Sequence, residues 1–166
     1  IPVGDNRIIN TDELYFEPVG ETFNVKGTDK KTFALRLMAG EGKYFEQKYT
    51  LTGNSYLFNF DINMVGLGDI IPANNNVISG QWKNTLSALE RTLELERRYS
   101  ALYYRYNESD VAHLSEDNET DEITFDAPVE WISYKQQFFN TTLFSKQDIE
   151  KGGKLKTFYN KNDNGY

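Results

Sequence analysis

TFALRLMAGEGKYFEQKYTLTGNSYLFNFDINMVG, residues 32–66, alternates apolar and polar side chains in three runs separated by two turns. The apolar positions that share one face are Phe33, Leu35 and Leu37 in the first run, Phe45, Tyr49 and Leu51 in the second, and Tyr56, Phe58, Phe60, Ile62 and Met64 in the third. Such a period of two is typical of strands with one buried face, and short turns containing Gly or Asn join antiparallel neighbours. The stretch therefore predicts an antiparallel meander of three strands.

Short β-rich runs bounded by Gly, Asn and Asp extend this pattern along the rest of the chain. We expect further strands around the opening stretch and at residues 76–83, 100–106, 122–126 and 154–159. Many short strands with turn signals between them are typical of a β-sandwich. The sequence therefore predicts an all-β fold.

Residues 87–98, SALERTLELERR, allow two interpretations. Ser87 stands three residues before Glu90, as in a capping box, and Glu94 and Arg98 have the i, i+4 spacing of a helical ion pair. The alternation of Leu and Glu at residues 93–96 would instead suit a strand. We favour one short helix in this segment, with a strand as the alternative.

Length and composition narrow the class of protein. The 166 residues are the usual length of one domain, so we expect a single domain over residues 1–166. The formal net charge of −7 disfavours nucleic acid as a partner, and the chain contains no cysteine and hence no disulfide. No run of about 18 apolar residues could cross a bilayer. Because the chain begins IPVGDNR, without an initiator Met or a signal segment, we expect it to be part of a longer protein.

Few residues of the sequence are candidates for catalysis or for binding a metal or cofactor. Residues 108–126 hold eight acidic side chains and the only histidine, His113, but lack the Gly and the spaced ligands of a helix-loop-helix calcium site. A solvated loop is the better interpretation of this segment. The sequence therefore predicts no catalytic, cofactor-binding or metal-binding residues, and no enzyme. The adjacent pair Tyr103 and Tyr104 would point to opposite faces of a strand, so one of them is expected to face outward or to meet another layer.

Three stretches, in this order, resemble one known family: NTDELYF at residues 10–16, RRYSALYYRY at 97–106 and WISYKQQFF at 131–139. They are similar to the large periplasmic domain of the YidC-type membrane protein insertases of Gram-negative bacteria. The resemblance runs over nearly all of the chain, and the third stretch with its preceding acidic segment is the most specific part. In the family, additional strands precede the first stretch and a helical portion follows the last, so both ends look trimmed.

The resemblance implies a twisted antiparallel β-supersandwich of the galactose mutarotase type, in the periplasm and tethered to the inner membrane through segments outside this sequence. It also implies contacts with Sec translocon accessory subunits of the SecD and SecF kind and with nascent membrane proteins. The residues of the family that act in insertion lie mostly outside this sequence, so none is assigned here and the binding residues are unknown. The alternative is a carbohydrate-binding or mutarotase-like domain, since one fold can serve several functions.

The stretch EWISYKQQFF, residues 130–139, can be a helix face or two strands, because Trp131, Tyr134 and Phe138 have the spacing i, i+3, i+7. The preceding Pro128, the β pattern around it and the implied fold favour two strands, with the bend at residues 135–137. On this interpretation Trp131 and Phe139 belong to the core.

Overall fold

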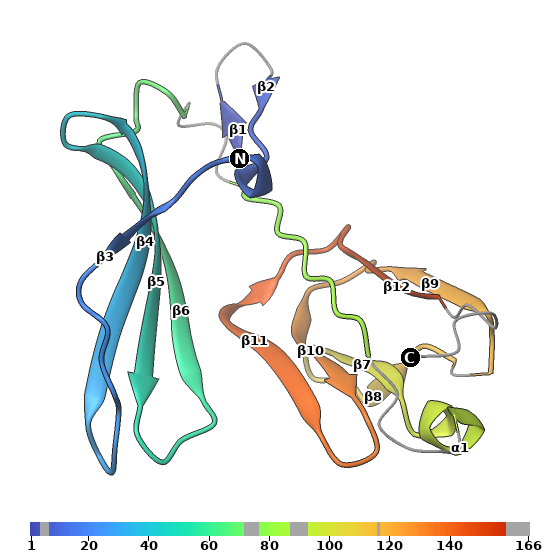
Figure 1. The fold of residues 1–166 in the computed structure, drawn as a ribbon. Coiled ribbons are helices and arrows are strands. Elements are labelled where there is room, and N and C mark those ends of the chain that lie inside the picture. The colour runs from blue at the N-terminus through green and yellow to red at the C-terminus, as the bar shows by residue number, and fades with distance from the viewer. Residues whose placement is uncertain (4–6, 72–76, 87–92, 116, 159–166) are drawn as a thin grey trace. The chain divides into compact units, whose positions relative to one another are not determined.

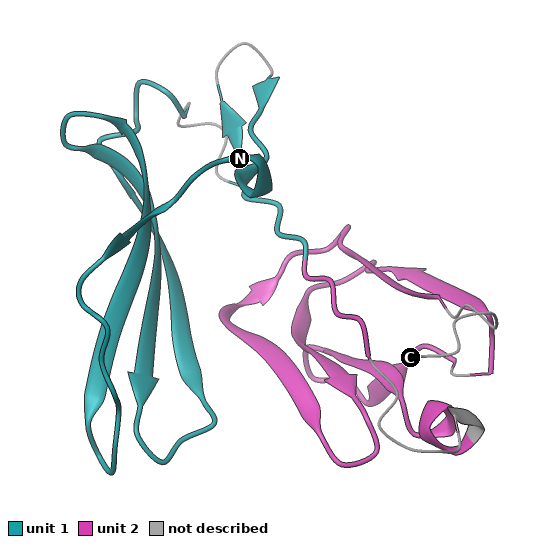
Figure 2. Ribbon diagram, in the orientation of Figure 1, with its two compact units in different colours: residues 1–81 teal, residues 82–166 magenta. Residues whose placement is uncertain are grey.

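Antiparallel strands are the main elements of the chain (Figure 1). The computed structural model describes residues 1–3, 7–71, 77–86, 93–115 and 117–158. The prediction of an all-β fold with very little helix is confirmed. The chain divides into two compact units, Ile1–Gln81 and Trp82–Tyr166, which Figure 2 distinguishes by colour.

The main sheet of the first unit contains the predicted meander. It has the strand order β3-β4-β5-β6, and the strands are β3 (Glu17–Val19), β4 (Lys30–Gly40), β5 (Lys43–Thr52) and β6 (Phe58–Val65). A small hairpin of β1 (Pro2–Val3) and β2 (Arg7–Ile8) and the 3₁₀ turn Thr11–Glu13 precede it. The three strands expected from residues 32–66 are therefore confirmed. The third begins only at Phe58, so Tyr56 lies outside it, and its apolar side chains do not form the buried face that was expected, because Phe58, Phe60, Ile62 and Met64 are all exposed.

The two faces of this sheet differ in polarity, as the alternation predicts. On the apolar face Phe33, Tyr49 and Phe60 lie in one row across three strands, with ring centroids 4.7 Å apart for the first pair and 5.0 Å for the second. On the polar face Glu46 lies between Arg36 and Asn63 in a row of its own. Cross-strand pairs of this kind hold antiparallel strands in register.

The second unit contains a four-stranded sheet and a two-stranded one. The larger has the order β11-β10-β7-β8, the smaller is β12-β9, and the strands are β7 (Ala101–Tyr106), β8 (Val111–His113), β9 (Thr120–Thr124), β10 (Val129–Lys135), β11 (Asn140–Ile149) and β12 (Lys154–Phe158). Both sheets contribute to one hydrophobic core, whose buried members are Leu102, Tyr104, Leu114, Phe125, Val129 and Leu155. One face of the larger sheet is therefore covered by the core.

The helix expected within residues 87–98 is present as α1 (Leu93–Arg98), and the strand alternative is wrong for these residues. The capping box of Ser87 and Glu90 and the side chain of Glu94 lie outside the described residues. No helix of the described residues is long and apolar enough to cross a membrane.

The strand expected at residues 76–83 is wrong for residues 77–83, and residue 76 lies outside the described part. Trp82 is held by Tyr134 instead of by a strand partner. The hydroxyl of Tyr134 donates a hydrogen bond to the backbone oxygen of Trp82 at 2.8 Å, and the two rings meet edge to face at 4.5 Å. Trp82 therefore packs against Tyr134 without belonging to a strand.

Residues 130–139 contain one strand, β10, and the turn that leads to β11, so the helix interpretation is wrong and only the first of the two expected strands lies within this stretch. Lys135 still belongs to β10 and pairs with Asn140 of β11, so the bend comprises residues 136–139 and not 135–137. The backbone N–H of Gln136 closes the bend by donating to the oxygen of Phe139 at 2.7 Å. At the tip of a hairpin no second layer covers the side chains. Phe139 is accordingly 66% exposed, and its assignment to the core is wrong. The assignment of Trp131 to the core is wrong as well, because its half-buried side chain lies on the face of the sheet opposite to the core cluster.

Candidate binding groove

Alternation along three neighbouring strands divides their side chains between the two faces of the larger sheet in the second unit. Ser133 of β10 lies opposite Tyr103 of β7 and Thr142 of β11, and Trp131 lies opposite Phe144. The intervening residues turn toward the core: Leu102, Tyr104, Ile132 and Tyr134. The register therefore collects aromatic and polar side chains on the face that the core does not cover.

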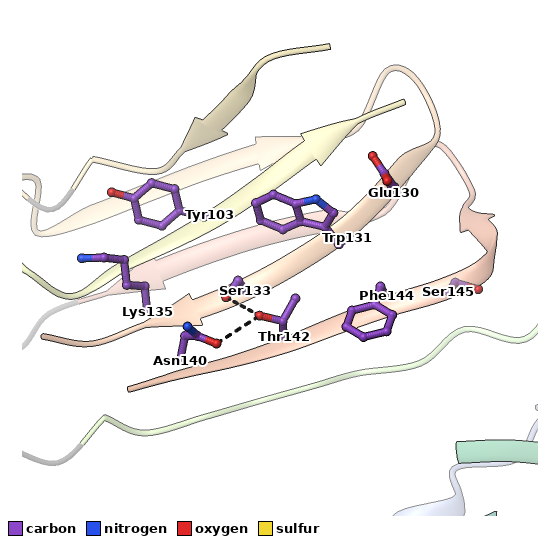
Figure 3. A pocket seen from close by; sticks show the side chains of 9 residues that line it. All are labelled: Tyr103, Glu130, Trp131, Ser133, Lys135, Asn140, Thr142, Phe144 and Ser145. Atoms are coloured by element: carbon purple, nitrogen blue, oxygen red, sulfur yellow. Dashed lines mark hydrogen bonds between the residues drawn. The ribbon is translucent and has the colours of Figure 1, made fainter. Parts of the chain in front are cut away.

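This face holds a shallow groove of about 620 Å³ (Figure 3). The residues that line it are Tyr103, Glu130, Trp131, Ser133, Lys135, Asn140, Thr142, Phe144 and Ser145. Trp131 and Phe144 provide apolar surface from adjacent strands, and Phe144 is 57% exposed. The Ser133 and Thr142 hydroxyls bond each other at 2.8 Å between the strands. The groove thus combines aromatic surface with a polar floor, a composition common in ligand sites.

A lysine ammonium lies at one end of the groove. Lys135 Nζ donates to the backbone oxygen of Tyr99 at 3.1 Å and lies 5.9 Å from the ring centroids of Tyr99 and Tyr103. No carboxylate of the described residues forms an ion pair with Lys135. This end of the groove is therefore positively charged.

The opposite end carries a carboxylate that already has a partner. Glu130 lies 3.4 Å from Arg105 Nε, which also donates to the backbone oxygen of Ser109 at 3.0 Å. The charges of Glu130 and Arg105 compensate each other. When Arg105, which lies beside the lining, is counted with Glu130, the charge of Lys135 is the one that remains uncompensated in and next to the groove.

The tyrosine pair of β7 divides as predicted. Tyr104 is 5% exposed in the core, where burial raises its pKa, while Tyr103 faces outward into the groove. Tyr103 also stacks on His113, with ring centroids 5.1 Å apart and an interplanar angle of 27°. His113 is exposed and does not line the groove. The one histidine of the chain therefore lies beside the groove and not within it.

The acidic segment 108–126 is more ordered than the loop that the sequence suggested, because β8 and β9 lie within it. Glu122 of β9 lies 3.7 Å from Lys154 Nζ and 3.5 Å from Lys156 Nζ across the pair with β12. Asp121 accepts a hydrogen bond from the backbone N–H of Ser115 at 2.7 Å. Glu116 lies outside the described residues. In the part of the chain that is described, no group of acidic or histidine side chains could hold a metal ion.

The sequence interpretation assigned no binding residue, and the groove residues of β11 were missed. Thr142 and Phe144 alternate with Thr141 and Leu143, so the period of two was present in the sequence. The sequence did not show the pairing register that places Phe144 beside Trp131. Only the folded hairpin provides this register.

Comparison with known proteins agrees with the resemblance. The family described as YidC periplasmic domain matches residues 1–165. The chain is 34% identical to a membrane protein insertase YidC of Parabacteroides distasonis, and the match covers 87% of this chain and 22% of the relative. The corresponding protein of Phocaeicola vulgatus is 31% identical, with 93% and 24% covered, and that of Bacteroides fragilis is 30% identical, with 95% and 24% covered.

The chain thus spans less than a quarter of the length of these relatives. No solved structure matches it. The family match extends over nearly every residue and includes both compact units. The chain belongs to the YidC periplasmic domain family, the periplasmic part of a membrane protein insertase.

Proposed function

We propose that this domain is a non-catalytic interaction module, which supports the insertion and folding of inner-membrane proteins by binding other proteins in the periplasm. The partners that we propose are Sec translocon accessory subunits of the SecD and SecF kind, and nascent membrane proteins as a second class. The observation that supports this function is the groove on the face of the sheet β11-β10-β7-β8 that the core of the second unit does not cover.

Aromatic surface beside hydrogen-bonding groups is typical of the centre of a protein interface. Trp131 and Tyr103 supply such surface from the two central strands, and Phe144 supplies it from the strand at the edge. The net charge of −7 disfavours nucleic acid as the partner. A protein partner therefore suits this face best.

Site-specific photo-crosslinking in the intact insertase tests this proposal. A photoreactive residue at Phe144, which faces the groove, is expected to form adducts with the accessory subunits or with nascent chains. Leu143 is the matched control, because it is 44% exposed and points to the other face of the same strand. Adducts from residue 144 and few from residue 143 would support the proposal. A groove that forms adducts with neither class of partner would overturn it and favour a domain that acts as a spacer.

The second candidate is carbohydrate binding in the same groove, which the Trp131 ring and the neighbouring hydroxyl and amide groups favour. Stacking on an aromatic ring with hydrogen bonds at its edge is a chemistry that suits sugar rings. Mutarotase-like catalysis has less support, because His113 lies outside the groove lining. Calorimetric titration with hexoses and with periplasmic glycan fragments distinguishes the two functions, since only a sugar site would release heat that Trp131→Ala abolishes.

A further inference from the structure

We propose that the turn between β5 and β6 inserts into the surface of a bilayer that contains anionic lipid. The inserted part is residues 56–58, which we term the apolar tip, and the lipid phosphates are bound by Lys26, Lys30 and Lys31 beside it. The inference goes beyond the proposed function, because it concerns the first unit and lipid, whereas the groove lies in the second unit and is assigned to a protein partner.

The apolar tip exposes three consecutive large side chains. Tyr56 is fully exposed, Leu57 is 66% exposed and Phe58 is 60% exposed. Within the described residues no other three consecutive large apolar side chains are all exposed. Apolar side chains gathered at one exposed place mark a contact with another molecule or with a membrane.

Hydrogen bonds hold the turn that carries the tip (Figure 1). The N–H of Gly53 donates to the backbone oxygen of Asp29 at 2.8 Å, and the N–H of Leu57 donates to the hydroxyl oxygen of Ser55 at 3.0 Å. Residues 53–57 lie between the end of β5 and the start of β6 and belong to neither strand. The tip therefore projects from the end of the sheet, and its backbone is stabilised without any contact to lipid.

The end of the sheet at the tip is positively charged. Residues 26–31 and 50–60 together contain three lysines and one acidic residue, Asp29, which is a formal net charge of +2 in a chain of net charge −7. In the part of the chain that the structure describes, no carboxylate forms an ion pair with any of the three lysines. Their charges therefore remain uncompensated at this end.

The strand register places these lysines beside the tip. Lys31 lies in one row with Phe58 across β4, β5 and β6, and the side chains of such a row point to the same face. Lys30 begins β4 in the neighbouring row. The carbonyl group of Lys26 lies against Gly53, at the start of the turn that carries the tip. Lysines of the adjoining strand and of the adjoining turn therefore border the tip.

This combination suits the surface of an anionic bilayer. Tyrosine is enriched at the boundary between acyl chains and headgroups, and lysine side chains extend their ammonium groups to the phosphates. An acidic chain is repelled by anionic lipid as a whole, so a contact requires a local excess of positive charge such as this one. The domain is the periplasmic part of an inner-membrane protein, and a tethered contact requires only weak affinity.

Quenching of a fluorescent label by lipid tests the inference in the intact insertase, reconstituted into vesicles. The dye NBD is attached to residue 57 through Leu57→Cys, in an insertase without other cysteines, and nitroxide-labelled lipids are the quencher. Vesicles of phosphatidylcholine alone are compared with vesicles that also contain phosphatidylglycerol.

We expect at least about threefold stronger quenching with the anionic lipid, because the lysines add electrostatic attraction to the insertion of the tip. High salt should remove this difference, since it screens exposed charges. Equal quenching in the two kinds of vesicle, or no quenching in either, would overturn the inference.

A label at the other end of β6 is the control for position. Met64→Cys places the dye at an apolar residue that is 41% exposed, near the end of the strand that Phe58 begins. The length of strand between residues 58 and 64 is about 20 Å, more than the depth of about 5–10 Å to which interfacial segments enter a bilayer. The label at residue 64 should therefore be quenched far less than the label at residue 57. Equal quenching of the two labels would overturn the inference, as would a blue-shifted emission at residue 57 without quenching, which would show that protein covers the tip.

Two pairs of substitutions separate the local charge from the net charge. Lys30→Gln with Lys31→Gln should reduce quenching at residue 57 in anionic vesicles nearly to the level in neutral ones. Lys146→Gln with Lys151→Gln removes the same charge from exposed positions of the second unit and should leave quenching unchanged. Substitutions at exposed lysines change stability little, so a loss of quenching would not reflect unfolding. Equal losses from the two pairs would overturn the inference.

The outcome is independent of the proposed function. Quenching at residue 57 without crosslinks from residue 144 would overturn the proposed partners and leave this inference in place. Crosslinks from residue 144 without quenching at residue 57 would overturn the inference alone.

Discussion

Glu46, in the sheet of the first unit, is buried, with 7% of its surface exposed. It accepts hydrogen bonds from Arg36 Nε at 2.7 Å and from the Asn63 side-chain amide at 2.9 Å. These partners come from the two flanking strands. Glu46 therefore connects β4, β5 and β6 through side chains in addition to the backbone ladder.

We predict that Glu46→Gln lowers the free energy of unfolding by about 1–3 kcal/mol, because a charge-assisted bond is lost and an amide cannot accept both donors equally well. Urea denaturation measures this change. Glu17→Gln is the matched control, since this exposed residue lies opposite Arg36 in β3 and its replacement should change stability by less than about 0.5 kcal/mol. Equal effects of the two substitutions would show that Glu46 has no special role.

The stabilisation by Glu46 should depend on pH. The hydrogen bond from Asn63, together with that from Arg36, holds the pKa of Glu46 below its ordinary value of 4.5. A lowered folded-state pKa means that the stabilisation is fully present above pH 4.5 and is lost as the pH falls through the lowered value. The difference in stability between wild type and Glu46→Gln should therefore shrink below this pH in urea titrations. A difference that stays constant down to pH 3 would contradict this mechanism.

At the scale of elements, the end of β5 comes very close to the turn that precedes β4. The N–H of Gly53 donates to the backbone oxygen of Asp29 at 2.8 Å. A Cβ at Gly53 would lie 2.5 Å from the carbonyl carbon of Lys26 and 2.7 Å from the oxygen of Gly27, so only glycine fits without a backbone shift. This contact helps to set where the two strands begin and end.

We predict that Gly53→Ala destabilises the chain by about 1–3 kcal/mol, because backbone atoms and not a flexible side chain must move. Gly68→Ala is the control, since a Cβ there would meet nothing within 4 Å. The midpoint of urea unfolding by circular dichroism measures both. A Gly53→Ala variant as stable as Gly68→Ala would mean that the turn relaxes at no cost.

At the scale of the whole molecule, the buried core cluster and the groove both lie in the second unit. The family match nevertheless runs from residue 1 to residue 165. We propose that residues 1–166 unfold as a single domain, as the length of the chain suggests. A substitution in the core of one unit can test whether the other unit responds.

We predict that Leu102→Ala, at a residue 2% exposed in the core, lowers the free energy of unfolding by about 2–5 kcal/mol. In a single domain the slowest amide hydrogens of β5 and of β7 should then exchange faster by the same factor. Leu143→Ala, at a residue 44% exposed in the same sheet, should change neither. Faster exchange in β7 alone would show that the two units unfold independently.

The sequence by itself predicted the strands whose side chains alternate over a long run. Residues 32–66 form the expected meander, and Tyr103 and Tyr104 point to opposite faces, because a period of two depends only on local backbone geometry. The three ordered stretches that resemble the insertase family also identified it correctly. The helix at residues 93–98 was likewise expected from a local pattern, the i, i+4 spacing of Glu94 and Arg98.

Only the tertiary structure decided which faces are covered. Phe139 has the chemistry of a core residue, yet it lies at a hairpin tip with 66% of its surface exposed. The groove likewise joins Tyr103, Trp131 and Phe144 from three strands, through a register that no single stretch encodes. Alternation shows which side chains share a face, but burial depends on contacts between residues far apart in the chain, and these form only when the strands pair and pack.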